Sequence, residues 1–341
     1  VNFEAKVTLI ERTGVQFLDF GLKLNLRQEL PGEFVARETS QSLARLEYDE
    51  RTDRHWHPAN PGVAVKSELS VPLDESVKLL LDSWVPIPVL RIHPPRVFAE
   101  GPLTWARARL VEIDADEDPE GNTHRLILGL DTQVFEHSAE TTYLAPTTAD
   151  VQSGVSFAFA HRDHEIGWWL EIPWTDGWLR ELFKENAQSR LRLPPEDVEE
   201  ELRRLTHQAH YLNLLALLGE RARLPEIKLL SNRASRDFKP PIPVDMVLDV
   251  GNSRTCGILI EEHPADNGLR WRYELELRDL SAPERLYAEP FESRVEFAQA
   301  VFGKEHWACQ SGRPDAFLWP TIARTGREAA RLAARRRGTE G

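Results

Sequence analysis

The stretch Val244–Glu262 reads VDMVLDVGNSRTCGILIEE. Apolar residues dominate its two ends, and the polar segment Gly251–Thr255 separates them. Two short apolar runs joined by a glycine-containing polar turn are typical of a β-hairpin, and runs this apolar predict buried strands. A third strand is expected at about Arg270–Leu280, which would extend the hairpin into a three-stranded meander.

The turn of this hairpin carries residue types that can hold phosphate groups. Gly251 permits a positive φ and lets a phosphate approach without meeting a Cβ. Asn252, Ser253 and Thr255 add short donor side chains, and successive N–H groups of a turn can form a nest for an anion. We therefore predict that Gly251, Asn252, Ser253, Arg254 and Thr255 bind the β- and γ-phosphates of a nucleotide.

Asp249 closes the first strand of the hairpin and is expected to point at the same place. A carboxylate beside phosphates makes sense only with a cation between them. We predict that Asp249 is the catalytic residue of the site and positions Mg²⁺, directly or through a water molecule. ATP and Mg²⁺ are therefore the expected cofactors.

The residues before the hairpin divide into two regions. Residues 1–173 read mainly as strands, because apolar and polar residues alternate over Phe3–Glu11, Gly14–Leu26, Trp105–Ile113 and His124–Leu130. A short helix is expected near Ser76–Trp84, where Pro86 would stop it. Residues 174–243 predict a helical bridge with helices at about Gly177–Arg190 and Glu196–Glu220, followed by a connector ending in Pro240–Pro243.

Composition is that of a folded protein in a reducing compartment. The 341 residues are 41% hydrophobic, which is enough for ordinary buried cores. No apolar run approaches the roughly 20 residues that span a membrane. The start resembles no signal peptide, and it lacks an initiating Met, so a few residues can precede it. Only Cys256 and Cys309 occur, which favours a cytoplasmic location, with export as an effector left open.

The charge of the chain argues against nucleic acid and acidic membranes as partners. The formal net charge is −13, so the overall field repels both. The last 21 residues depart from this trend, with six Arg against two Glu. We expect that basic run to be the solvated end of a helix, where cations suit the helix dipole. A patch for nucleic acid or a protein partner is the alternative.

The pattern Asp249-x-Gly251-x-Ser253-x-Thr255 resembles the first phosphate motif of the actin, chaperone and sugar-kinase superfamily. Ser293–Phe297 falls where DnaK-type chaperones have a strand, and Thr321–Leu332 resembles their strand-to-helix turn. The resemblance implies that residues 244–341 are the opening part of an actin-like, ribonuclease H-like ATPase domain. The predicted fold class is then α/β (α+β overall), with domains at 1–173 (β-rich), 174–243 (helical bridge and connector) and 244–341.

A closer resemblance is to the SrfB family of bacterial virulence factors. LDVGNSRTCGILIE at 248–261 and DAFLWPTIARTGREA at 315–329 look like that family, most strongly over about 210–335. Those proteins are much longer and have an extended region before the phosphate hairpin. The resemblance implies that this chain is the N-terminal part of such a protein.

The chain departs from the chaperone pattern in two ways. Asn252 stands where chaperones usually have Thr or Ser. Asn also donates hydrogen bonds and occurs there in type III pantothenate kinases, so nucleotide binding is expected and hydrolysis stays open. The chain also ends at Gly341, before the second phosphate motif and the adenosine-binding turn would come. We therefore expect ATP and Mg²⁺ to bind only in the full-length protein.

Other candidate sites have simpler interpretations. His55 and His57, like His161 and His164, could supply two metal ligands, but no further ligands follow at metal spacing. His207 and His210 are expected on a helix surface. Four tryptophans within eleven residues could anchor a partner, although core packing where strands meet helices is the commoner use; they are Trp168, Trp169, Trp174 and Trp178. The acidic loop 114–120 lacks the calcium-ligand register.

The function expected of the intact protein is ATP–Mg²⁺ binding, with slow hydrolysis left open, that drives a conformational change. ATP and an unidentified protein are the expected partners, without nucleic acid and without a membrane span. One alternative is a small-molecule kinase of the same superfamily, which is disfavoured because those chains begin with the phosphate motif. The other is a non-enzymatic interaction protein with a relic hairpin and a Trp-rich binding region. Fold analogy alone does not choose among them.

Overall fold

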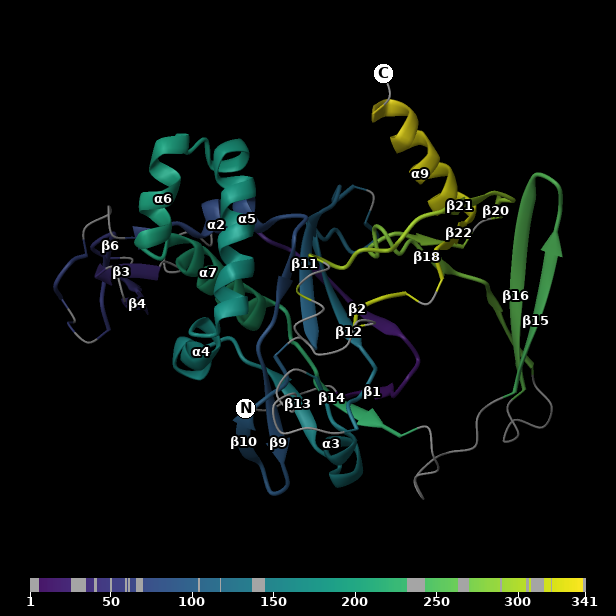
Figure 1. Cartoon of the computed structure of the whole chain (residues 1–341), viewed down its shortest axis with the longest axis horizontal. Coiled ribbons are helices and arrows are strands. Elements are labelled where there is room, and N and C mark those ends of the chain that lie inside the picture. Colours follow the sequence, from purple (N-terminus) through teal and green to yellow (C-terminus); the bar gives the residue numbers. More distant parts are fainter. Residues whose placement is uncertain are drawn as a thin grey trace. The chain divides into compact units, whose positions relative to one another are not determined.

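The computed structural model describes residues 6–25, 35–39, 42–49, 51–58, 60, 62–65, 70–103, 105–116, 118–136, 145–231, 243–262, 270–288, 290–304, 307, 316–319 and 321–339. The chain is a mixture of helices and strands, which confirms the predicted α+β class (Figure 1). It forms two compact units. Unit 1 is Val1–Ser231 with Phe302–Phe317, and unit 2 is Asn232–Val301 with Leu318–Gly341.

Two sheets form the framework of unit 1. The five-stranded sheet has the order β1 (Lys6–Ile10), β14 (Glu226–Leu230), β13 (Ser156–Phe159), β9 (Val89–His93) and β10 (Val97–Glu100). β1 and β14 are parallel, and the other pairs are antiparallel. The antiparallel four-stranded sheet has the order β2 (Val15–Leu22), β12 (His124–Asp131), β11 (Ala106–Glu112) and β8 (Trp84–Pro86).

Large apolar side chains join these two sheets. Trp105 is 1% exposed, and its ring centroid lies 4.6 Å from that of Phe157 on β13. The indole Nε1 donates to the Asp131 carbonyl oxygen at 2.8 Å, so the buried N–H is satisfied. The alternation that predicts strands at Trp105–Ile113 and His124–Leu130 therefore has its apolar residues in a common core.

Smaller strands and the helices complete unit 1. A three-stranded sheet has the order β4 (Ser42–Arg45), β3 (Val35–Thr39) and β7 (Ser70–Val71), and β5 (Glu47–Asp49) pairs with β6 (Arg54–Trp56). Figure 1 shows most of the helices gathered on one side of the two main sheets. They are α2 (Leu73–Leu80), α4 (Asp163–Leu170), α5 (Pro173–Leu191), α6 (Pro195–Arg203) and α7 (Thr206–Arg221), while α3 (Thr148–Ser153) lies apart.

Two helix predictions need correction. The short helix α2 begins and ends a few residues before the predicted Ser76–Trp84, and Pro86 lies in strand β8. The single helix predicted over Glu196–Glu220 is two helices, α6 and α7. Leu205 lies between them with φ +60°, a left-handed conformation that ends the helical hydrogen bonding. α5 begins with Pro173 at its first position, where a proline costs no hydrogen bond.

Helix α7 is buried on nearly all sides, which overturns the surface positions expected for two histidines. His207 and His210 are each 2% exposed. The Nδ1 of His210 lies 2.9 Å from the Ser76 hydroxyl of α2, and Asn213 donates to the Val71 carbonyl at 2.7 Å. Helix α7 therefore holds α2 and β7 through buried polar contacts as well as apolar packing.

A segment distant in sequence also belongs to unit 1. Arg107 on β11 is 2% exposed, and its guanidinium lies over the ring of Phe317 and near that of Trp178. Burial lowers the pKa of Arg107 to about 9, although the nearby Asp131 acts to raise it. The Phe317 N–H donates to the Asp131 carboxylate at 2.9 Å. Phe317 thus lies in the core of unit 1.

The tryptophan cluster packs in the core, as predicted. Trp169, Trp174 and Trp178 are 0%, 8% and 1% exposed, and Trp168 is half-buried. Neighbouring rings of the cluster lie 5.4 to 6.3 Å apart. Unit 1 therefore contains both the strands and the helices that the sequence places in separate regions.

Unit 2 begins with the predicted meander. β15 (Val244–Val250), β16 (Arg254–Glu262) and β17 (Arg270–Glu274) are antiparallel in that order, and β20 (Phe291–Glu292) also pairs with β16. Two further antiparallel pairs are β18 (Leu277–Arg278) with β19 (Leu286–Tyr287), and β21 (Val295–Phe297) with β22 (Ala323–Thr325). α9 (Gly326–Thr339) follows β22 directly, which confirms the strand-to-helix turn. Pro240–Ile242 of the predicted connector lie outside the described residues.

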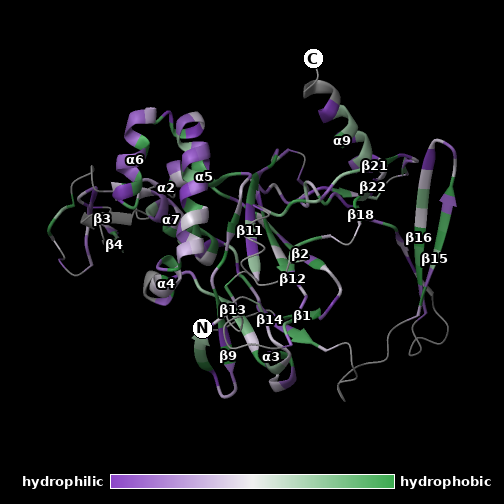
Figure 2. Ribbon diagram, in the orientation of Figure 1, coloured by the Kyte–Doolittle hydropathy of each residue, from purple (hydrophilic) through white to green (hydrophobic). Residues whose placement is uncertain are grey.

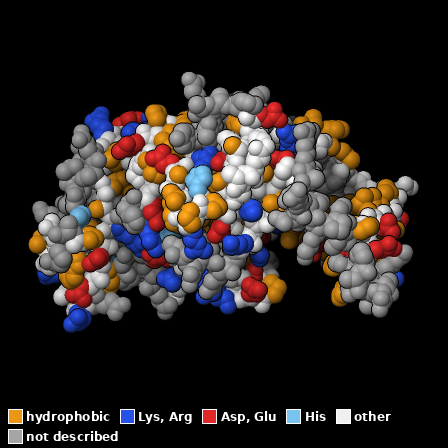
Figure 3. Space-filling model, turned by 90° about the horizontal axis from the view of Figure 1, so that it is seen from below, with side chains coloured by type: hydrophobic (Ala, Val, Ile, Leu, Met, Phe, Trp, Pro, Cys, Tyr) orange, Lys and Arg blue, Asp and Glu red, His pale blue; other side chains and the backbone are white. Residues whose placement is uncertain are grey.

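The burial predicted for the hairpin strands is wrong. Val244, Met246, Val247, Leu248 and Val250 are 46 to 70% exposed. Figure 2 shows hydrophobic stretches along both β15 and β16, and Figure 3 shows hydrophobic side chains at the surface of the lobe that holds them. β15 is an edge strand of its sheet, so it pairs on one side only. Apolar composition predicts the strand, but burial also requires a covering element.

Candidate functional site

The predicted phosphate turn forms a tight bend between β15 and β16. The register pairs Val250 with Thr255, and the Gly251 N–H donates to the Arg254 carbonyl at 2.9 Å. A Cβ on Gly251 would lie 2.9 Å from that same carbonyl oxygen, closer than real Cβ atoms come. Gly251 does not adopt the positive φ that a glycine permits. Glycine is needed here because the turn closes tightly on itself.

The hairpin register separates two of the predicted site residues. Asp249 pairs with Cys256, and Val250 pairs with Thr255. Directly opposed residues of an antiparallel pair share a face, and successive residues alternate between faces. Asp249 therefore lies on the other face of the hairpin from Thr255. Asp249 is exposed near the end of β15, close to the turn. Because side chains alternate along the strand, Asp249 shares its face with Val247 and Asp245.

Ser293 braces the turn from the neighbouring strand. Its hydroxyl donates to the Gly251 carbonyl at 2.7 Å and lies 2.8 Å from the Thr255 hydroxyl. Its backbone N–H donates to the Ser253 carbonyl at 3.0 Å. Pairing of β20 with β16 brings Ser293 to this place. The Thr255 hydroxyl is thus engaged in holding Ser293, a contact that no local sequence signal indicates.

The tip of the turn leaves hydrogen-bond donors unused. Within the described residues, the backbone N–H groups of Asn252 and Ser253 donate to no acceptor. Both residues are exposed, as is Arg254, whose guanidinium has no partner in the same part of the chain. Successive unpaired N–H groups beside a cation form a concavity suited to an anion. The arrangement can therefore hold a phosphate group.

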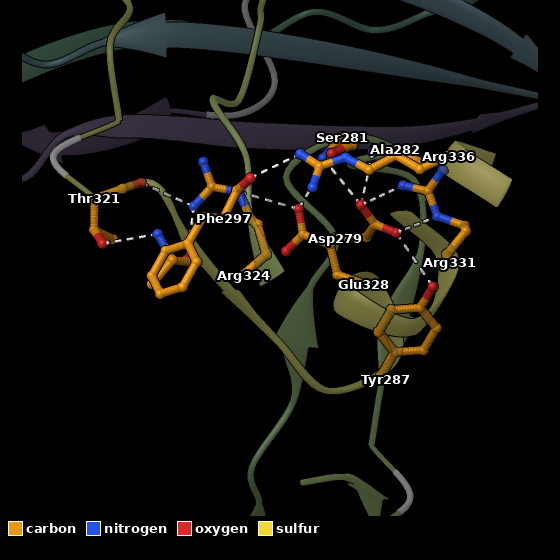
Figure 4. Close-up of polar contacts among 11 residues, drawn as sticks. Asp279, Ser281, Ala282, Tyr287, Phe297, Thr321, Arg324, Glu328, Arg331 and Arg336 are labelled. Carbon is orange, nitrogen blue, oxygen red and sulfur yellow. Dashed lines mark hydrogen bonds and ion pairs between the residues drawn. The ribbon is translucent and has the colours of Figure 1, made fainter. Parts of the chain in front are cut away.

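The second half of unit 2 is fixed by a buried ion pair. The Asp279 side chain is fully buried and accepts from Arg331 Nε and Nη2 at 2.8 and 2.7 Å. The N–H groups of Ser281 and Ala282 also donate to it, at 2.9 and 3.0 Å. Figure 4 shows Arg331 and Tyr287 directed at this carboxylate. Because every lone pair has a donor, the pair holds α9 firmly against the β18–β19 hairpin.

The basic end of the chain is only partly solvated, which corrects the sequence prediction. Arg335 and Arg336 are exposed, whereas Arg324 is 2% exposed and lies 3.4 Å from Glu328. Burial raises the pKa of Glu328, and the negative charge of Asp279 raises it further. Two of the six arginines are thus internal ion-pair partners in unit 2.

Gly326, the first residue of α9, connects that helix to the segment beside the phosphate turn. It has φ +61°, and a Cβ there would lie 2.8 Å from the Phe291 ring. Its N–H donates to the Arg294 carbonyl at 3.1 Å, next to Ser293. The start of α9 therefore packs directly on the strand that braces the turn.

The histidine pairs show no metal centre in the part of the chain that the structure describes. Among the residues that the structure describes, no group of three or more His, Cys, Asp or Glu could hold a metal ion. Burial lowers the pKa of His55 and of His161, which disfavours their charged forms. Asp249 alone would supply a protein ligand to Mg²⁺ at the turn. A single protein ligand fits Mg²⁺, which is usually bound through one or two carboxylates together with waters and substrate phosphates.

Comparisons with known proteins identify the family. The model of the family described as Virulence factor SrfB matches residues 1–341. The chain therefore belongs to the SrfB family, as its resemblance over the hairpin and the strand-to-helix turn implies. No curated protein and no solved structure matches it. Among the helices of the described residues, none is both long and apolar enough to cross a membrane.

Proposed function

We propose that this member of the SrfB family binds a magnesium–nucleotide complex through the turn of the β15–β16 hairpin. The observation that carries the proposal is the pair of unused N–H donors at Asn252 and Ser253, in a turn held by Ser293. A preformed nest of this kind stabilises an anion without having to reorganise.

Each residue of the turn has a distinct part in the proposed site. Gly251 keeps the turn closed, and the Asn252 and Ser253 N–H groups face the phosphates. Arg254 supplies a positive charge, which pairs well with phosphate oxygens. Asp249 holds Mg²⁺ from the other side of the turn, directly or through water. Thr255 acts by positioning, because its hydroxyl is engaged with Ser293.

Mg²⁺, when bound, neutralises the repulsion between the Asp249 carboxylate and the phosphates. Without that cation, an exposed carboxylate two residues before Gly251 disfavours an anion. Nucleotide binding through this turn therefore depends on the metal, and Asp249 is the residue that makes it so.

The order of elements supports ATP as the nucleotide. A three-stranded antiparallel meander is followed in the chain by the paired strands β21 and β22 and then by a helix. This is the order in which the sequence resembles the opening of an actin-like ATPase domain. Members of that superfamily couple nucleotide state to a change of conformation. We propose the same use here, a nucleotide-driven switch, in preference to phosphorylation of a metabolite.

The test compares two aspartates on the same strand. Asp249 and Asp245 share a face of β15 and are both exposed, but only Asp249 adjoins the turn. Titration calorimetry of the full-length protein with ATP should show Mg²⁺-dependent binding that Asp249→Ala abolishes and Asp245→Ala retains. Equal binding by the Asp249→Ala variant would refute the assignment. Absence of binding by the unaltered protein would favour a relic hairpin in an interaction protein.

A further inference from the structure

Unit 1 contains a cavity of about 570 Å³ that the proposed function does not use. It lies among α4, α5, the start of α7 and strand β4, far along the sequence from the phosphate turn. Its lining includes Leu170, Glu171, Asp176, Arg180, Leu205 and Gln208. The volume lies in the range of about 300 to 1,000 Å³ that is typical of ligand pockets.

The break between α6 and α7 helps to form this cavity. Leu205 has φ +60°, which is strained for a residue with a side chain, and it lines the wall. A continuous helix would carry the chain through this point without strain. The strained backbone therefore coincides with the place where the wall of the cavity is made.

Asp176 organises the polar side of the cavity. Its carboxylate accepts from His207 Nε2 at 2.6 Å, from Gln208 Nε2 at 2.8 Å and from Arg180 Nε. Burial opposes ionisation of Asp176, but these hydrogen bonds prevail and hold its pKa well below the usual range. Three protein donors thus engage the carboxylate, so the role we give Asp176 is to position its neighbours.

Arg180 is left with donors to spare. Asp176 engages its Nε, and within the described residues its two terminal nitrogens have no partner. A guanidinium fixed through Nε presents Nη1 and Nη2 side by side, a geometry that suits a carboxylate. The Arg180 side chain is 38% exposed, so a ligand in the cavity can reach it.

The cavity also has two hydrogen-bond acceptors, on Glu171 and Gln208. Glu171 is exposed, and its carboxylate has no partner in the described part of the chain. Gln208 directs its amide nitrogen at two acceptors, Asp176 and the Leu170 carbonyl, which assigns the orientation of the amide. Its carbonyl oxygen is therefore left as an acceptor. The cavity offers a carboxylate-binding fork, an amide acceptor and an anion between walls of leucine and proline.

We propose that this cavity binds a short peptide with apolar side chains and free termini. The C-terminal carboxylate pairs with Arg180, a peptide N–H donates to Gln208, and the N-terminal ammonium pairs with Glu171. The apolar walls, which include Leu170, Leu205 and Leu212, cover the peptide side chains. A fatty acid would use Arg180 but leave Glu171 and Gln208 unmatched, and a cation would meet Arg180.

The probes are three tripeptides, Leu-Ala-Leu, Val-Ala-Leu and Leu-Gly-Phe, titrated into the full chain by calorimetry. At least one should bind. Amidation of its C-terminus should weaken binding by about tenfold or more, because a charged hydrogen-bonded pair is lost. Acetylation of its N-terminus should weaken binding by about two- to fivefold, because Glu171 is exposed. Binding by none of the three, or equal binding of the capped peptides, overturns the proposal.

Variants distinguish recognition from folding. Arg180→Gln leaves Asp176 its donors from His207 and Gln208, and it should reproduce the effect of amidation with no further loss when both are combined. Lys184→Gln is the matched control on the same helix, since it removes a charge from an exposed ion pair with Glu199. Leu205→Gly relieves the left-handed strain and should weaken binding without lowering the unfolding temperature. Unchanged affinity in the Arg180→Gln variant also overturns the proposal.

Discussion

Strands β12 and β15 are similar in composition and opposite in burial. His124–Asp131 (HRLILGLD) and Val244–Val250 (VDMVLDV) are both mainly apolar, with a few polar residues between. Leu126, Leu128 and Leu130 of β12 are 0% exposed, whereas Leu248 of β15 is 46% exposed. β12 has a partner on both sides, β2 and β11, and β15 is an edge strand. The comparison teaches that a sequence pattern specifies the strand, while the neighbouring elements determine how far its side chains are buried.

The same contrast separates the two candidate sites. The cavity of unit 1 lies among helices and strand β4, and its polar side chains are fixed by hydrogen bonds such as that from His207 to Asp176. The phosphate turn of unit 2 lies at the tip of an exposed hairpin. Among the described residues, its shape depends on hydrogen bonds from Ser293 and on the Gly251–Arg254 bond of the turn itself. A site of the first kind is preorganised by packing, and a site of the second kind by a few hydrogen bonds.

The same Leu→Ala substitution in β12 and in β15 should give the largest difference in the free energy of unfolding. Leu128→Ala in β12 should lower the free energy of unfolding by about 2–5 kcal/mol, because it leaves a cavity in a fully buried sheet. Leu248→Ala in β15 should cost less than about 1 kcal/mol, because nearly half of that side chain already meets solvent. Urea unfolding of the two variants measures both values. Equal costs would mean that β15 is covered in solution and would break the comparison.

Mild acid should lower the stability of unit 1, by less than the Leu128→Ala substitution does. Burial lowers the pKa of His124, His161 and His207, all of which belong to unit 1. A histidine whose folded pKa is depressed binds its proton more readily when unfolded, so stability is lost as pH falls below the unfolded value of about 6.5.

The measurement is the free energy of unfolding between pH 7.5 and 5, followed by tryptophan fluorescence. Stability should decline on the acid side, and His207→Gln should make that decline shallower. Asp176 keeps its other donors in this variant, so the fold is retained. A pH profile that His207→Gln leaves unchanged would show that this histidine is not held neutral by the core.

Local signals in the sequence are enough to predict much of unit 2. The β15–β16 hairpin, the third strand and the turn into α9 follow from apolar alternation and from Gly251 and Gly326. A glycine in a turn does not by itself predict a positive φ: Gly326 has one, and Gly251 does not. The braces depend on contacts between residues distant in sequence, such as Ser293 with Gly251, and no local pattern reports those.

Unit 1 shows where sequence patterns fall short. Nothing in the residues around Leu205 indicates a left-handed conformation, since neither Gly nor Asn stands there. Tertiary packing imposes the break, so a single helix was the natural prediction. The burial of His207 and His210 had a detectable signal, because leucines occupy several faces of α7 at once. A helix that is apolar on most sides is a buried helix, and its polar residues are then internal.

The most direct test of the phosphate turn is amide hydrogen exchange of residues 249–255 in the full-length protein, followed by mass spectrometry with and without Mg²⁺–ATP. The Asn252 and Ser253 N–H groups have no acceptor within the described chain, so they should exchange quickly in the free protein. Saturating Mg²⁺–ATP should slow exchange in this segment and leave the β17 segment 270–274 unchanged, and Asp249→Ala should remove the slowing. Exchange in 249–255 that is the same with and without Mg²⁺–ATP, in a protein shown to be folded, would contradict the account.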